Sequence, residues 1–102
     1  MNITKEQVRD ALRKDDFDYI NDQIERLMSA AKSSLLVAIG YKNGTPIHKD
    51  TAAEFEELTN CYIVEYVRAG LDLVDNEKML TALATQCEAL IREAEAEEGG
   101  GQ

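Results

Sequence analysis

The residues that could carry out chemistry in this chain are few and scattered. The only histidine is His48, and Cys61 and Cys87 belong to no Cys-x-x-Cys or Cys/His pattern. No glutamate has a histidine three residues on, the spacing that di-iron helical proteins use, and no nucleotide-binding or hydrolase motif is present. We therefore expect no catalytic residue, no metal and no cofactor, and we do not expect an enzyme.

The cysteines and one glutamate lie in apolar helical patterns. Cys61 and Cys87 both fall on apolar faces, so we expect small buried side chains in a reducing compartment, with a disulfide as the minor alternative. Glu65 interrupts the apolar run 61–67. It is expected to reach an edge, to pair with a base such as Arg68, or to face a neighbouring subunit.

The charge of the chain is large and uneven. The net charge is −9 over 102 residues, which argues against binding of nucleic acid through its phosphates. Residues 1–14 hold four basic and two acidic side chains, a balance of +2, which leaves −11 for the remainder. Lys5, Arg9 and Arg13 follow one another at intervals of four, so on a helix they form a single basic row. Such a row is usually a solvated face, but contact with an acidic neighbour would also explain it.

Hydrophobic spacing predicts four helices, over about 4–13, 16–39 and 51–69, and from a cap at Asp75 or Asn76 through Ala94. Thr4 with Gln7 and Thr51 with Glu54 match the capping-box pattern. Gly40 follows the second helix at the position where a left-handed residue ends a helix. The glutamates from 93 to 98 add negative charge at the negative end of the helix dipole, so we expect fraying there.

The apolar residues of each helix define the expected core. The apolar run 61–67 should be covered on several sides, and residues 80–94 form a seam suited to packing against one other helix. In the long helix over 16–39 the apolar stripe consists of Ile20, Ile24, Leu27, Met28, Ala31, Leu35, Ala38 and Ile39.

The segment 41–50 is predicted to be a projecting loop. It holds the only proline and an Asn-Gly pair, which favour a tight turn over a continued helix. A loop of this length suggests a contact with a partner. The residues assigned to that contact are Tyr41, Lys42, Asn43, Gly44, Thr45, Pro46, Ile47 and His48.

Together these patterns predict an all-α, four-helix bundle-like domain over residues 1–96, with one long central helix, the projecting loop at 40–50 and a flexible acidic and glycine-rich tail over 97–102. No apolar run approaches the roughly 18 residues that a membrane span requires, and the N-terminus lacks the apolar stretch of a secretory signal. We expect a cytosolic protein, unless it leaves inside a larger assembly.

The order of these parts resembles one known family. A short capped helix, ITKEQVRDALR, precedes an acidic connector, KDDFDYI, and a long helix ending SAAKSSLLVAIG; a turn-rich loop then leads to FEELTNCYIVEYV. This order is similar to that of the small head–tail connector, or adaptor, proteins of tailed bacteriophages, and the likeness covers residues 3 to about 95. The C-terminal seam, which here runs into a glutamate-rich end, departs from the family pattern.

The resemblance implies a virion protein, assembled in the cytoplasm of the bacterial host. It implies a homo-oligomeric ring of about twelve subunits below the portal, closed by head-to-tail contacts. The partners would be the portal protein and the next tail-completion protein, and DNA would pass through the ring without sequence-specific binding. No membrane contact is expected.

Two interpretations remain open at this stage. In the connector interpretation, Lys5, Arg9 and Arg13 border an intersubunit contact with the acidic face of the next subunit. The 41–50 loop and the 80–94 seam would then meet the portal and the next tail component. In the alternative, the chain is a small acidic helical regulator, or a DNA mimic, that binds a basic protein as a monomer or dimer.

Overall fold

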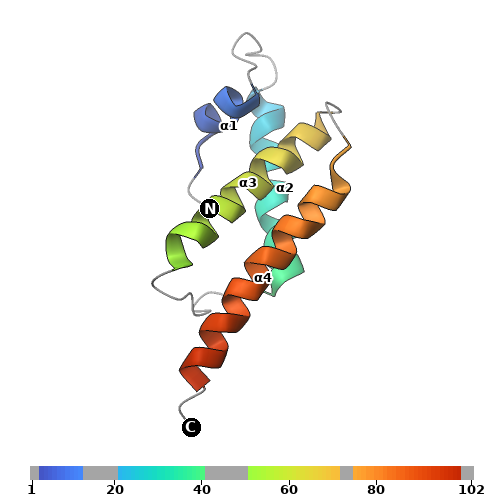
Figure 1. The fold of residues 1–102 in the computed structure, drawn as a ribbon. Coiled ribbons are helices and arrows are strands. Elements are labelled where there is room, and N and C mark those ends of the chain that lie inside the picture. The colour runs from blue at the N-terminus through green and yellow to red at the C-terminus, as the bar shows by residue number, and fades with distance from the viewer. Residues whose placement is uncertain (1–2, 13–20, 41–50, 72–74, 100–102) are drawn as a thin grey trace.

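The computed structural model describes residues 3–12, 21–40, 51–71 and 75–99. These residues form four helices: α1 (Lys5–Leu12), α2 (Asn21–Ile39), α3 (Ala52–Gly70) and α4 (Glu77–Gly99) (Figure 1). The predicted all-α, bundle-like architecture is therefore confirmed. The predicted start of the second helix at residue 16 and the loop over 41–50 lie outside the described residues.

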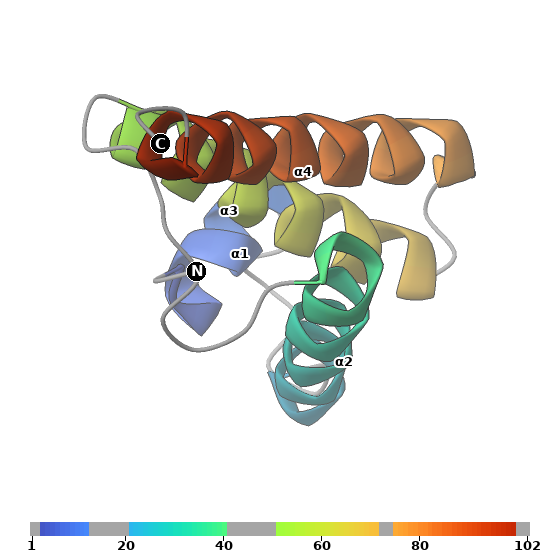
Figure 2. The ribbon, with the colours of Figure 1, turned by 90° about the horizontal axis from the view of Figure 1, so that it is seen from below.

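The arrangement places α3 in the middle of the domain. α2 and α3 each contact the other three helices. Figure 2 shows α3 between α4 on one side and α1 with α2 on the other. The molecule measures 55 × 23 × 18 Å, and its radius of gyration of 14.9 Å exceeds the ~13 Å expected for a compact domain of this length. The bundle is thus elongated, and the last turns of α4 extend beyond the other helices (Figure 1).

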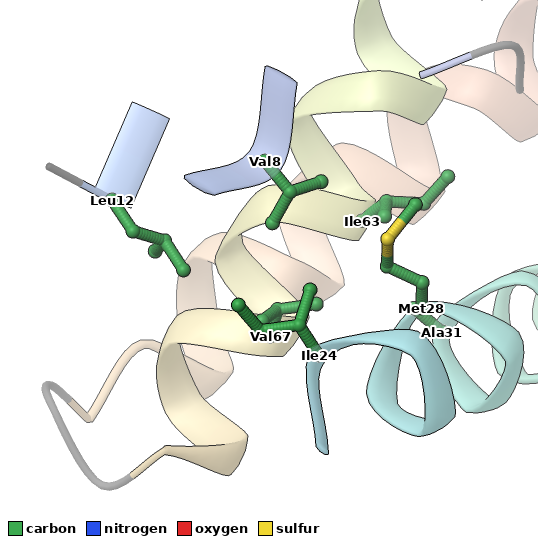
Figure 3. Close-up of a cluster of buried hydrophobic side chains, with 7 residues drawn as sticks. All are labelled: Val8, Leu12, Ile24, Met28, Ala31, Ile63 and Val67. Carbon is green, nitrogen blue, oxygen red and sulfur yellow. The ribbon is translucent and has the colours of Figure 1, made fainter. Parts of the chain in front are cut away.

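Two separate apolar clusters hold the helices together, one on each side of α3. In the first, α1 and the N-terminal half of α2 close over the C-terminal half of α3 (Figure 3). In the second, the C-terminal end of α2 and the middle of α4 close over the other side of α3. Tyr66 packs against both clusters. The first cluster consists of Val8, Leu12, Ile24, Met28, Ala31, Ile63 and Val67, and the second of Leu35, Ile39, Phe55, Tyr62, Cys87, Leu90 and Ile91.

The run 61–67 explains why α3 occupies this position. Tyr62, Ile63 and Val67 are buried, and Val64 and Tyr66 are half-buried. Because these residues surround the helix axis, they lose contact with water only if neighbours lie on more than one side. The prediction of coverage on several sides is confirmed, and α1, α2 and α4 of the same chain provide it. A hydrogen bond of 3.2 Å between the hydroxyls of Ser34 and Tyr62 adds a polar tie from α2 to α3.

The first predicted capping box is confirmed and the second is wrong. The Thr4 backbone N–H donates to Gln7 Oε1 at 2.9 Å, and the Gln7 backbone N–H donates to Thr4 Oγ1 at 3.2 Å. Thr51 is the N-cap of α3 but makes no side-chain capping hydrogen bond. Its φ of −109° and ψ of 3° differ from the extended backbone of an ordinary N-cap residue, which directs the side chain at the free N–H groups.

Gly40 ends α2 as predicted, with a φ of 66°. Its backbone N–H donates to the carbonyl of Val37 at 3.3 Å, and the left-handed backbone carries no steric cost at a glycine.

The apolar stripe of α2 was predicted almost correctly. Leu27 is half-buried, Ala38 is exposed, and Ile20 lies outside the described residues. Ala38 is exposed because it lies at the edge of the stripe, where α2 and α4 leave an open groove. The five predicted positions that are buried are Ile24, Met28, Ala31, Leu35 and Ile39.

The seam of α4 packs inside the chain, and the helix is longer than expected. Cys87, Leu90, Ile91 and Ala94 are buried, and Leu80, Leu83 and Ala84 are half-buried. α4 stays helical to Gly99, through glutamates at which we expected fraying and into the segment assigned to the tail. Alanine and glutamate both favour helix, and that local preference outweighs the repulsion at the helix end.

Candidate functional site

The basic row of α1 was the first predicted contact site. Lys5 Nζ lies 3.0 Å from Glu25 Oε1 of α2, so this lysine pairs within its own chain. The hydrogen bond that Lys5 Nζ donates to Glu25, together with the negative charge of that carboxylate, raises the pKa of Lys5 above its ordinary value. An acidic neighbour was one explanation for the basic row. For Lys5 that neighbour is Glu25 of α2 in the same chain.

Of the other predicted contact residues, Arg9 is the one that the structure describes. Arg9 is half-buried on α1, one turn after Lys5. Arg13 and the whole partner-contact loop, Tyr41 to His48, lie outside the described residues. The structure therefore describes two of the three residues in the basic row and none of those in the predicted contact loop.

A groove between α1 and α3 was not predicted from the sequence. It encloses about 470 Å³ and is mostly apolar, within the size range of small-molecule sites. We call it the α1–α3 groove. Ile3 and Ala11 line it on the α1 side, and Cys61 and Val64 line it on the α3 side; the polar residues along it are Glu56, Glu57, Asn60 and Glu65.

Charge is segregated across α1. Helical spacing places Lys5 and Arg9 on the side of α1 away from Ile3 and Ala11, and Lys5 faces α2. The groove on the other side of α1 instead carries acidic groups, which belong to α3: Glu56, Glu57 and Glu65 line it. The α1–α3 groove therefore combines an apolar floor with negatively charged edges.

A second groove, between α2 and α4, is smaller. It encloses about 350 Å³ and is lined in part by Ala38, Leu80 and Ala84. The hydroxyls of Thr81 and Thr85 along it donate to carbonyls one turn earlier in α4, at 3.1 and 2.9 Å. These hydroxyls are engaged with their own helix, so they give the groove little capacity to donate hydrogen bonds to a ligand.

Glu65 pairs within the chain. Its Oε2 lies 3.4 Å from Arg68 Nε. Asn76 Nδ2 donates to that same Oε2 at 2.9 Å and to the Glu65 backbone carbonyl at 2.8 Å. Asn76 directly precedes α4, and its own carbonyl accepts the hydrogen bond from the Leu80 N–H. Glu65 therefore ties α3 to the start of α4, in agreement with the predicted pairing to Arg68.

The two cysteines are in different environments. Cys87 is fully buried in the second cluster, as expected, and burial raises the pKa of its thiol from 9.0 to about 11. Cys61 is exposed and lines the α1–α3 groove, so the prediction that it is buried is wrong. α1 and α2 cover the neighbouring face of α3 and leave this position open. Both thiols are free.

Within the described parts of the chain, no group of three or more His, Cys, Asp or Glu residues could hold a metal ion. None of the described helices is long and apolar enough to cross a membrane.

Comparison with known proteins identified no relative. No protein family model matches the chain, and neither a curated protein nor a solved structure matches it.

Replacing Asn76 with Ser tests the tie between α3 and α4. Serine is still a favourable N-cap residue, but it is too short to reach Glu65. We expect the free energy of unfolding to fall by about 1–3 kcal/mol, because the half-buried Glu65 loses the hydrogen bonds that Asn76 donates to its carboxylate and its carbonyl. Chemical denaturation followed by circular dichroism measures this loss. Asp75→Ser, a change at an exposed neighbouring residue, should change the free energy of unfolding little. Equal losses of stability in the two variants would contradict the role of Asn76 in tying α4 to Glu65.

The buried thiol of Cys87 should make stability depend on pH in the alkaline range. Below pH 9.0 the folded and unfolded chains both keep the proton, whereas between 9.0 and about 11 only the folded chain keeps it. The free energy of unfolding should therefore fall as the pH rises through this window. Denaturation curves measured across this pH range should show that the free energy of unfolding falls less with pH in Cys87→Ala than in wild type. In Cys61→Ala it should fall as much as in wild type. Identical slopes for wild type and Cys87→Ala would contradict the prediction.

Proposed function

We propose that this chain is a structural protein of the head–tail connector class of tailed bacteriophages. In this role it forms a ring of about twelve copies below the portal, in the virion, and the genome passes through the ring. The portal protein lies on one side of the ring and the next tail-completion protein on the other. The protein acts by contact with other proteins and carries out no chemistry.

The observation that carries the proposal is the order and type of the helices. A short helix with a capping box, a long helix ending at a left-handed glycine and a helix whose later part, 61–67, is mostly apolar follow one another. This is the order of parts on which the resemblance to the connector proteins rests. The uneven charge supports the proposal further, because a basic segment over residues 1–14 and an acidic remainder favour head-to-tail association.

The structure removes one argument for assembly. Apart from Cys61 and Val64 at the α1–α3 groove, the apolar run 61–67 and the 80–94 seam pack against helices of the same chain, so most of their apolar surface needs no neighbouring subunit to shield it from water. For the ring, the contacts that remain proposed are the basic row and the loop over 41–50.

The packing of most apolar residues inside the chain also favours a second candidate, a small acidic regulator or DNA mimic that binds a basic protein. A chain that covers its own apolar surface can function as a monomer, and many of its carboxylates are exposed, among them Glu54, Glu57 and Glu93. The two candidates differ in their expected mass, which the experiment below measures.

Reversal of the basic row tests the connector proposal. We expect wild type to form a large closed oligomer as its concentration rises, and the triple variant Lys5→Glu, Arg9→Glu, Arg13→Glu to remain monomeric and helical. Native mass spectrometry over a concentration series, with negative-stain imaging of large species, measures both. A monomer or dimer for wild type at every concentration would contradict self-assembly and favour the regulator.

Two controls separate the intersubunit contact from other effects. Because Lys5 pairs with Glu25, adding Glu25→Lys to the triple variant restores that intrachain pair while the row stays acidic. If this addition rescues the ring, the row acts within the chain and the proposed contact is wrong. Arg26→Glu, Lys32→Glu, Lys78→Glu changes the net charge equally at other described positions, and should leave the ring intact.

A further inference from the structure

We propose that the α1–α3 groove binds a basic amphipathic helix of a partner protein. The apolar face of that helix would lie on Ile3, Ala11 and Val64, and its basic side chains would reach the carboxylates at the edges of the groove. This binding does not depend on ring formation. An experiment can therefore contradict the proposed ring and leave the proposed groove binding intact, or the reverse.

The shape and lining of the groove fit a row of apolar side chains. At about 470 Å³, mostly apolar and open, it has room for a row of side chains on a single helix face. Recognition of amphipathic helices uses such apolar grooves between helices, with anchors at intervals of three and four residues.

Charge selects a basic helix over an acidic one. Glu57 is exposed and lines the groove, Glu56 lines it beside Glu57, and Glu54 is exposed one helical turn before Glu57. Arg68 follows on the same side of α3, but it is paired with Glu65. The exposed charges at the groove are therefore negative, and a partner with lysine or arginine beside its apolar face complements them.

A second copy of this chain is a poorer occupant. The chain as a whole is strongly acidic, and its described basic row already meets Glu25 through Lys5. A second copy that met the groove with its acidic surface would bring like charges together there, which costs binding energy. The proposal therefore commits to a different protein with a basic amphipathic segment.

The exposed thiol of Cys61 gives a local reporter for occupancy. Cys61 lines the groove, whereas Cys87 is fully buried and has a thiol pKa of about 11, so at pH about 7.5 iodoacetamide reacts with Cys61. The probe is a synthetic helix of about 14 residues with leucines at intervals of three and four and with lysines elsewhere. We expect a saturating amount of this peptide to slow alkylation of Cys61 by about tenfold or more, as peptide mass spectrometry measures.

Matched peptides and variants decide the result. A peptide of the same composition with scrambled order, and one with glutamate in place of lysine, should leave the rate of Cys61 alkylation unchanged. Glu57→Lys should weaken the protection by about tenfold, whereas Glu93→Lys, the same charge change on exposed α4, should not. No protection at saturating peptide, equal protection by the scrambled peptide, or equal weakening by Glu57→Lys and Glu93→Lys would each overturn the proposal.

Discussion

Burial of α3 on two sides is the constraint on which the rest of this structure depends. The apolar residues of this helix surround its axis, so one neighbouring helix cannot shield them from water. α1 and α2 shield one side and α4 shields the other, and full burial of a residue such as Ile63 stabilises the fold by about 1.5–3 kcal/mol. The two clusters are joined through Tyr66, which contacts both. The polar tie from Asn76 to Glu65 then fixes the start of α4 against α3.

Most local features of the structure followed from local patterns in the sequence, with the capping box at Thr51 as the exception, whereas the exact neighbours of a residue across helices did not. Thr4 with Gln7 and the glycine at position 40 act over three or four residues, so their patterns were sufficient. The burial of Cys61 was predicted wrongly because an all-round apolar helix gives no sign of which side its neighbours leave open. The partner of Glu65 was only partly foreseen, since Arg68 is one turn away but Asn76 is eleven residues further along the chain. The α1–α3 groove was missed for the same reason: it exists only once α1 docks on α3.

The distribution of charge connects the fold to the proposed roles of the protein. The docking of α1 turns Lys5 toward α2, while carboxylates of α3 line the groove on the other side of α1, so the two sides of this short helix have surroundings of different charge. In a connector ring these two sides would meet different neighbours. In an acidic regulator the groove side alone would be in use. Both roles rest on contact between proteins, and in both the chain folds before it binds, because its apolar helix is already covered.

Residue-level hydrogen exchange of α3, measured at several protein concentrations down to the dilute monomer, tests this account most directly. If α3 is covered by its own chain, amides of Tyr62, Ile63 and Val67 should be strongly protected, and that protection should be independent of concentration. Amides in both clusters should then exchange with a similar free energy of opening. Protection that disappears on dilution would contradict the account, because it would show that neighbouring subunits, rather than α1, α2 and α4 of the same chain, shield the apolar helix.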